Sequence, residues 1–259
     1  MLISIKTHLV YFAAKPCDLL LQIEALDDAT QVCRDTQFTA DPDIEWRIID
    51  GEEKIGKRRW GRVMGMFDCA YQTQVRVDRP TVVFDRLNAT PLSSVPSEIT
   101  KFLMPSRYCF PEDFLATTAA QFQHLSGGAL IQAMSNWIEA NFTYDNGASM
   151  GSTTATETFA ARAGVCRDYA HVLIAMARVV GIPARIVSAY AAHVVPQDFH
   201  AVVEVYLDGQ WHLIDPTGMA KASEIVRIGV GRDAADVSFM TSYGAMELKK
   251  QSVNVVLVE

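Results

Sequence analysis

The sequence predicts an α+β protein, with an N-terminal antiparallel β-sandwich at residues 1–105 and a domain of helices and antiparallel strands at residues 106–259. Three observations support this prediction. Short β-branched and apolar runs, separated by polar turns that contain glycine, fill the chain up to about residue 96. Four prolines then mark a connection between residues 91 and 111. Beyond it, apolar residues recur at the spacing of helices before strands return.

The expected elements follow in order along the chain. The first domain should hold short strands at residues 19–26, 45–49, 63–67, 70–77 and 81–84. The mixed charges of residues 51–59 predict a solvated hairpin loop. The second domain should hold helices at residues 119–125 and 129–142 and, late in the chain, strands at residues 225–230, 237–241 and 253–258. The last of these strands is expected at a sheet edge.

The composition is that of a globular chain of 259 residues, long enough to bury a core without disulfide or metal support. Apolar residues make up 49% of the chain and charged residues 20%. The net charge of −7 disfavours nucleic acid or an anionic membrane as a partner. No apolar run has the length of a membrane span, and the first residues lack the pattern of a secretory signal. We therefore expect a cytoplasmic location.

The chain has five cysteines, scattered without Cys-x-x-Cys spacing, at Cys17, Cys33, Cys69, Cys109 and Cys166. This distribution disfavours a disulfide framework and a structural metal site. We expect no cofactor and no metal ion.

Cys166 begins a predicted helix over residues 166–180. Apolar residues at three- and four-residue spacing define one face of this helix, and Gly181 and Pro183 end it. Gly164 allows a tight backbone turn just before it. The first helical turn offers unpaired N–H groups and the positive end of the helix dipole, so it favours a thiolate, the reactive form of cysteine. The same N–H groups can stabilise an oxyanion on an attacked carbonyl.

A predicted β-hairpin places a histidine beside a carboxylate. Residues 200–215 are typical of two strands joined by a two-residue Asp-Gly turn. In that register Val202 faces Asp215, and because side chains alternate, His200 and Asp215 are diagonal neighbours on one face. A carboxylate there can hold the imidazole in one tautomer and stabilise its protonated form. A three-residue loop would instead put them on opposite faces.

Each of these residues also has a purely structural explanation. A free cysteine is most often a small buried hydrophobe, His200 could be a hydrogen-bonded core histidine, and Asp215 could be a turn residue before Pro216. Acid and base on one hairpin, together with the helix-initiating thiol, favour a nucleophilic triad of Cys166, His200 and Asp215.

Several segments resemble the bacterial transglutaminase-like superfamily. They are residues 156–158 (TET), 164–168 (GVCRD), 181–185 (GIPAR), 200–205 (HAVVEV) and 211–217 (WHLIDPT), with further similarity at 102–109 (FLMPSRYC) and 231–237 (GRDAADV). The resemblance implies a papain-like catalytic core behind an N-terminal domain. It also implies Cys166 as nucleophile, His200 as general base and acid, and Asp215 as the residue that orients His200.

The sequence departs from the pattern of many relatives at one position. They have His-Ala-Trp where this chain has Val202 after His200 and Ala201, so we expect a differently shaped acyl-binding groove. Animal transglutaminases also use calcium, but no Asp-rich loop with EF-hand spacing occurs here. Calcium dependence is therefore not expected.

The sequence thus predicts an acyl-transfer enzyme that forms a thioester on Cys166 while His200 moves the proton. Water as the acceptor would make it a hydrolytic cysteine peptidase or amidase acting on protein or peptide substrates, which the resemblance to bacterial members favours. An amine as the acceptor would make it a protein-glutamine transglutaminase. A different class of hypothesis is a non-catalytic protein-binding module on the same fold. The oligomeric state is left open.

Residues around the predicted triad have expected roles as well. Tyr144 and Asn146 are candidates for a second oxyanion donor. Asp168 should complement the helix dipole, and Arg167 should pair either with Asp168 or with a substrate carboxylate. Residues 145–156, rich in Gly, Ser and Thr, are either a plain surface loop or a mobile flap over the cleft. Three further histidines are expected to be structural or solvated, namely His171, His193 and His212.

Overall fold

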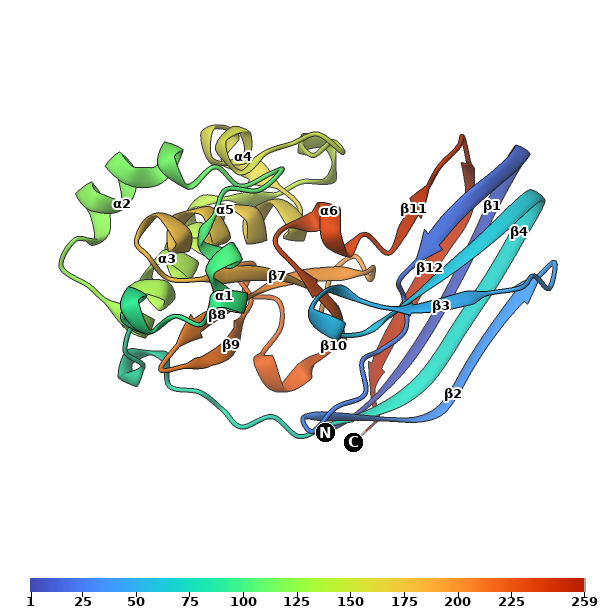
Figure 1. The fold of residues 1–259 in the computed structure, drawn as a ribbon, viewed down its shortest axis with the longest axis horizontal. Helices are drawn as coiled ribbons and strands as arrows, with labels where there is room; N and C mark the ends of the chain where they lie inside the picture. Colours follow the sequence, from blue (N-terminus) through green and yellow to red (C-terminus); the bar gives the residue numbers. More distant parts are fainter. Residues whose placement is uncertain (259) are drawn as a thin grey trace.

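The computed structural model describes residues 1–258, which form two parts that lie side by side (Figure 1). One part is a six-stranded antiparallel sheet, and the other is a four-stranded antiparallel sheet with helices packed on it. The α+β class predicted from the sequence is confirmed. The six-stranded sheet consists of β1 (Leu2–Leu21), β2 (Gln31–Asp41), β3 (Arg47–Asp50), β4 (Lys57–Val77), β11 (Met240–Ser242) and β12 (Glu247–Leu257).

The strands β1 and β4 pair over the whole length of β1. Alternate residues of β1 are buried on one face, beginning with Ile3 and Ile5, as the period of two in a strand requires. The pairing is irregular between Ala13 and Cys17, and Ala13 lies opposite Gly65, whose φ of +81° favours glycine. Buried residues before and after this irregularity belong to one hydrophobic cluster, so the bent sheet shares a common core.

The strands of the N-terminal part correct the sequence prediction. The runs expected at residues 63–67 and 70–77 belong to the single strand β4, and residues 81–84 are not a strand. β2 was not predicted because it is an edge strand with mostly exposed side chains, so it lacks an apolar run. The expected sandwich of two sheets is one bent sheet, because β2, β3, β11 and β12 all hydrogen-bond to β1 or β4. Of the hairpin loop predicted at residues 51–59, residues 51–56 join β3 to β4, whereas residues 57–59 already belong to β4.

The last strands of the chain return to the N-terminal sheet. β12 pairs with β1, with Ile3 opposite Leu257, and β11 pairs with the other end of β1, with Leu20 opposite Thr241. β12 is an edge strand, as predicted. The strand expected at residues 237–241 begins only with β11, because the helix α6 (Ala234–Val237) comes first. The N-terminal sheet is therefore not complete within residues 1–105.

The second sheet has the order β10-β7-β8-β9. These strands are β7 (Ala184–Ala191), β8 (His200–Leu207), β9 (Gln210–Ile214) and β10 (Ile225–Gly231). The helices before them are α1 (Ser97–Thr100), α2 (Leu115–Phe122), α3 (Gly127–Asn141), α4 (Ala155–Ala161) and α5 (Cys166–Val179). The predicted helices at 119–125, 129–142 and 166–180 correspond to α2, α3 and α5, although α2 begins and ends earlier than expected. Within residues 1–258, no helix combines the length and the apolar character that crossing a membrane requires.

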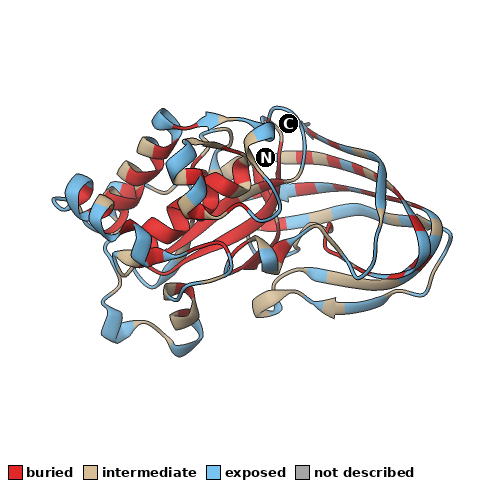
Figure 2. Cartoon of the chain, turned by 90° about the horizontal axis from the view of Figure 1, so that it is seen from above, coloured by how far each residue is buried: buried red, intermediate tan, exposed pale blue. Residues whose placement is uncertain are grey.

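The helix α5 packs on one face of β7 and β8, and every residue of β7 is buried. Figure 2 shows α5 and the strands beside it as almost wholly buried, whereas the long sheet alternates between buried and exposed residues. Gly181, with a φ of +80°, ends α5 as expected.

Buried charges join the two parts. Glu204 on β8 lies 2.7 Å from the Arg185 guanidinium and 2.8 Å from that of Arg227, and Arg227 also pairs with Asp28 of the N-terminal part. Burial alone would raise the pKa of Glu204, but the two arginines outweigh it and lower that pKa. Removing one partner would leave a buried charge uncompensated, so this network fixes the two parts against each other.

Candidate active site

Cys166 lies at the N-terminus of α5, where the backbone turns out of the short strand β6 (Ala163–Gly164). The fully buried Asp168 accepts a hydrogen bond of 2.9 Å from the Val165 N–H, so it caps the first turn. A Cβ at Gly164 would lie 2.8 Å from the Cβ of Asp168 and 2.9 Å from its Oδ2. Glycine at residue 164 therefore permits the close approach that holds Cys166 in place.

We expect the Gly164→Ala variant to be less stable than the wild type by about 1–3 kcal/mol, because the new methyl group must displace Asp168. The free energy of unfolding from urea titration measures the difference. Gly151→Ala is the matched control, since a Cβ at Gly151 meets nothing within 4 Å. Equal stability of the Gly164 variant and the control would contradict the packing argument.

His200 and Asp215 lie together on the hairpin formed by β8 and β9. Leu207 faces Gln210 and Val203 faces Ile214, which is the register predicted from the two-residue turn. His200 Nε2 and Asp215 Oδ2 are 2.9 Å apart, and the two side chains are 0% and 1% exposed. The predicted contact between imidazole and carboxylate is thus present.

The Asp215 carboxylate is held by three further hydrogen bonds. Oδ1 accepts from the backbone N–H of Thr217 at 2.9 Å and from its hydroxyl at 2.7 Å, while Oδ2 accepts from the Ala220 N–H at 3.0 Å. A carboxylate with this many donors is fixed in orientation. It therefore fixes the plane of the His200 ring.

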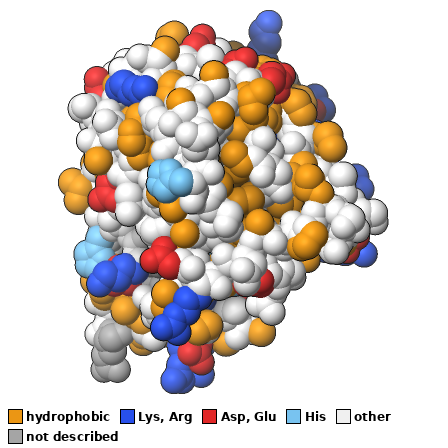
Figure 3. All heavy atoms as spheres, turned by 90° about the vertical axis from the view of Figure 1, so that its left-hand side faces the viewer, with side chains coloured by type: hydrophobic (Ala, Val, Ile, Leu, Met, Phe, Trp, Pro, Cys, Tyr) orange, Lys and Arg blue, Asp and Glu red, His pale blue; other side chains and the backbone are white. Residues whose placement is uncertain are grey.

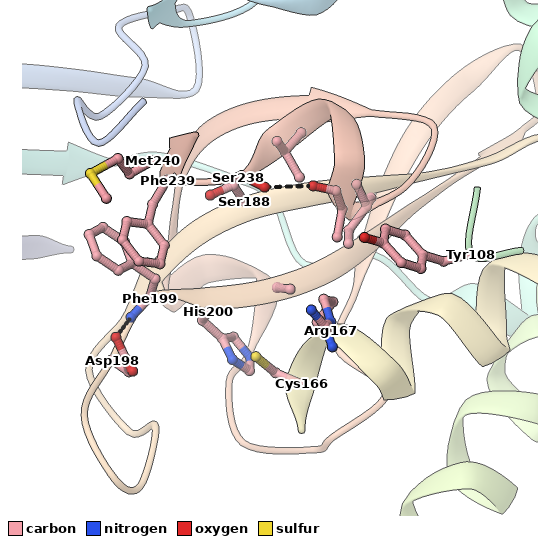
Figure 4. Close-up of a pocket in the computed structure, with 14 residues that line it drawn as sticks. Tyr108, Cys166, Arg167, Ser188, Asp198, Phe199, His200, Ser238, Phe239 and Met240 are labelled. Carbon is pink, nitrogen blue, oxygen red and sulfur yellow. Dashed lines mark hydrogen bonds between the residues drawn. The ribbon is translucent and has the colours of Figure 1, made fainter. Parts of the chain in front are cut away.

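The other ring nitrogen of His200 is available to Cys166. Nδ1 is buried and has no hydrogen-bond partner within residues 1–258, and the Cys166 sulfur lies beside the ring (Figure 4). Burial lowers the pKa of His200, but the hydrogen bond with Asp215 and the interaction with Cys166 outweigh it and raise that pKa to about 10. At neutral pH the ring therefore carries a proton and a positive charge next to the Cys166 sulfur.

Tyr144 also faces Cys166. The short strand β5 (Thr143–Tyr144) pairs with β6 in parallel, with Tyr144 opposite Gly164. Burial and the nearby Cys166 thiol raise the pKa of the Tyr144 hydroxyl, which therefore keeps its proton as a hydrogen-bond donor. Asn146, the other candidate donor, is exposed in the turn Asn146–Ala148.

A cavity of about 250 Å³ opens beside Cys166 and His200. Its walls come from the middle of β7, from the start of β8 with the two residues before it, and from the segment that runs from α6 to β11 (Figure 4). Apolar side chains dominate these walls, including Ile186, Phe199, Val237, Phe239 and Met240. Sequence reasoning missed most of them, because they converge from segments that are distant along the chain and carry no local motif.

Arg167 lines the cavity, but its guanidinium is already occupied. It pairs with Asp168 at 3.3 Å and donates to Ser149 Oγ at 2.8 Å and the Met150 carbonyl at 2.7 Å. Two partners were expected for Arg167, Asp168 or a substrate carboxylate, and the structure shows the pairing with Asp168. These bonds attach Arg167 to residues 149 and 150, and no residue of the segment 145–156 lines the cavity.

The three histidines that were expected to be structural or solvated lie outside the site. His171 is fully buried and accepts a hydrogen bond of 3.1 Å from the Ala234 N–H, which fixes the start of α6. Burial, Arg167 and Arg178 lower its pKa well below the usual value, so it is neutral. Two histidines contact other groups, as His212 Nε2 lies 3.1 Å from the Leu207 carbonyl and His193 Nδ1 lies 3.1 Å from Glu224.

The helix-covered end of the molecule carries a second hollow, where apolar side chains gather (Figure 3). A cavity of about 290 Å³ lies there between α2, α3 and the end of α5, with Leu115, Phe122 and Val180 among its walls. No ionisable side chain lines it. It therefore offers no acid or base that could activate a hydroxyl group, whereas the cavity beside Cys166 holds a thiol next to an imidazole that contacts a carboxylate. The cavity beside Cys166 is the candidate active site.

Comparison with known proteins agrees with this fold. Residues 116–216 match the family model described as the transglutaminase-like superfamily, a segment that contains the Cys166 helix and the His200–Asp215 hairpin. A crystal structure described as that of "a Putative Cysteine Protease from Cytophaga hutchinsonii" superimposes with a TM-score of 0.92 at 28% identity, covering 100% of this chain and 91% of that one. Residues 116–216 are therefore similar to the transglutaminase-like superfamily, and the whole chain shares the fold of the structure from Cytophaga hutchinsonii.

Two mycobacterial relatives extend the comparison. "Uncharacterized protein ML0607" of Mycobacterium leprae is 27% identical over 201 residues, which are 69% of this chain and 71% of that protein. "Uncharacterized protein Rv2569c" of Mycobacterium tuberculosis is 32% identical over 123 residues, which are 42% of this chain and 39% of that protein. Neither name states an activity, so the chemistry is argued from the site itself.

Proposed function

We propose that the protein is a thiol-dependent hydrolase of peptide or amide bonds, with Cys166 as nucleophile, His200 as general base and acid, and Asp215 as the residue that orients His200. One observation carries the proposal. The Asp215 carboxylate occupies Nε2 of a buried imidazolium, so its free Nδ1 is left for the thiol of Cys166. The structural relative described as a cysteine protease supports the hydrolytic choice.

The reaction balances through these three side chains. The Cys166 thiolate attacks the carbonyl carbon of the substrate, and the bond from carbon to nitrogen breaks as His200 gives its proton to the leaving amine. A thioester results. His200 then takes a proton from water, whose oxygen forms the new bond to carbon while the thiolate leaves. Backbone N–H groups at the start of α5 and the Tyr144 hydroxyl are the candidate donors to the oxyanion.

The acceptor of the acyl group separates hydrolysis from transamidation. We expect a peptide substrate to yield a free carboxylate in water, detected by mass spectrometry, and to yield a hydroxamate in addition when hydroxylamine is present. Hydroxamate without any hydrolysis would identify a transglutaminase instead. No acyl transfer to either acceptor, together with an unreactive Cys166, would favour the non-catalytic binding module.

Selective alkylation tests the activated thiol without a known substrate. We expect iodoacetamide at neutral pH to modify Cys166 faster than the other four cysteines, because the imidazolium of His200 stabilises its thiolate. Cys33 is the informative comparison: it is more exposed than Cys166, and burial and nearby aspartates raise its pKa to about 11. Peptide mass spectrometry over time gives each rate. Faster labelling of Cys33 than of Cys166 would remove the argument for activation.

A further inference from the structure

One wall of the cavity is built by residues 237–240, which connect the two parts of the molecule. The ring of Phe239 stacks on that of Phe199 with centroids 4.5 Å apart and planes 6° apart. Phe199, Phe239 and Met240 are only half-buried, so part of each apolar side chain is open to the cavity. Together these three side chains form an apolar wall within the site.

The N-terminal sheet holds this wall in position. The Phe239 carbonyl accepts a hydrogen bond of 2.8 Å from the Gln22 N–H, and Met240 pairs with Leu21 in the β1–β11 ladder. On the other side, His171 of α5 fixes the start of α6 through the Ala234 N–H. The wall is thus attached both to the sheet and to the helix that carries Cys166, so it is rigid relative to the thiol.

The cavity has the size and chemistry for one large apolar side chain. An apolar cavity of about 150 Å³ is enough to bind benzene, and this one measures about 250 Å³. Two cations line it: Arg167 is occupied by Asp168 and by the loop at Ser149, and the His200 ring is paired with Asp215. Asp198 is exposed at the rim. Both cations are thus engaged, so neither is free to pair with an acidic side chain in the cavity.

We propose that this cavity is a specificity subsite that binds one large apolar side chain, preferably aromatic, of a peptide substrate, and that Phe239 determines this preference. The proposal rests on the hydrolase function proposed above, since the side chain would be presented together with the bond that Cys166 attacks. It gives the N-terminal sheet a role in substrate selection. It also disfavours a glutamine side chain as the group that enters beside the thiol.

A binding experiment tests the subsite without any chemistry. Cys166→Ala protein is titrated calorimetrically with a series of alanine hexapeptides that carry one phenylalanine at each position in turn. We expect at least one peptide to bind about tenfold or more tightly than the all-alanine peptide, the size of effect that an apolar pocket gives. The Phe239→Ala change in the same background should abolish this difference, and Phe239→Leu should restore part of it.

A matched control separates the subsite from general effects on folding. Phe12→Ala removes a partly exposed aromatic ring from β1, outside the cavity, and should leave the preference for phenylalanine unchanged. Equal binding of all hexapeptides, or an unchanged preference in folded Phe239→Ala protein, would overturn the proposal. Because the assay lacks the thiol, its outcome is independent of the hydroxylamine and alkylation results, which test the hydrolase function itself.

Discussion

Replacing Cys166 with alanine is expected to lower peptide hydrolysis by about 10⁵–10⁶-fold, because the covalent route through the thioester is lost. The side chain is small and lies at the start of α5, so the fold should persist. The measurement is kcat/KM for a peptide substrate, accompanied by the unfolding midpoint of each variant. A residual rate within tenfold of the wild type would show that Cys166 is not the nucleophile.

Cys33→Ala is the control for this variant. Cys33 lies on β2 in the N-terminal sheet, and its thiol contacts the Leu26 carbonyl, not the cavity. Its replacement should leave kcat/KM unchanged. A loss of activity in Cys33→Ala protein similar to that in Cys166→Ala protein would point to a global effect of removing thiols.

Replacing Asp215 with asparagine is expected to reduce kcat/KM by about 10³–10⁴-fold, with a smaller effect on substrate binding. The amide has nearly the same shape, but it removes the negative charge that faces His200 Nε2 at 2.9 Å. The protonated ring of His200 then loses the negative charge that stabilises it, and the neutral ring is free to take the unproductive tautomer. Asp208→Asn, in the turn at the far end of the same hairpin, is the matched control and should retain activity.

The same variant should change the dependence on pH. His200 has a pKa raised to about 10, above its ordinary value of 6.5, so its stabilising contribution is complete below pH 6.5 and is lost as pH rises through about 10. Both the free energy of unfolding and the activity of the wild type should therefore fall as the pH rises from 6.5 to about 10. In Asp215→Asn protein the fall in activity should shift to lower pH. An identical pH profile in the two proteins would contradict the role of Asp215.

The hairpin and the helix α5 could be predicted because their signals are local. The Asp-Gly turn defines the register within a few residues, and that register alone brings His200 beside Asp215. The start of α5 is equally local, since Gly164 and the apolar spacing after Cys166 lie within one short segment. These are the parts of the site for which sequence reasoning sufficed.

The strands of the N-terminal sheet were harder to predict. β1 buries every second residue from Ile3 to Ala13, but a strand was expected only from residue 19. The lack of a long apolar run concealed β2. The apolar wall of the cavity was also missed. Phe239 contacts Phe199 only because β11 pairs with β1, and such a long-range pairing leaves no trace in local spacing.

The pairing of β12 with β1 has a consequence for biosynthesis. Residues 2–21 of β1 are synthesised long before their edge partner at residues 247–257. Until then, the exposed side of β1 presents unsatisfied backbone groups to other nascent chains. We expect the N-terminal sheet to finish folding only after the second part of the molecule has been synthesised. Deletion of residues 247–257 should yield a protein that aggregates.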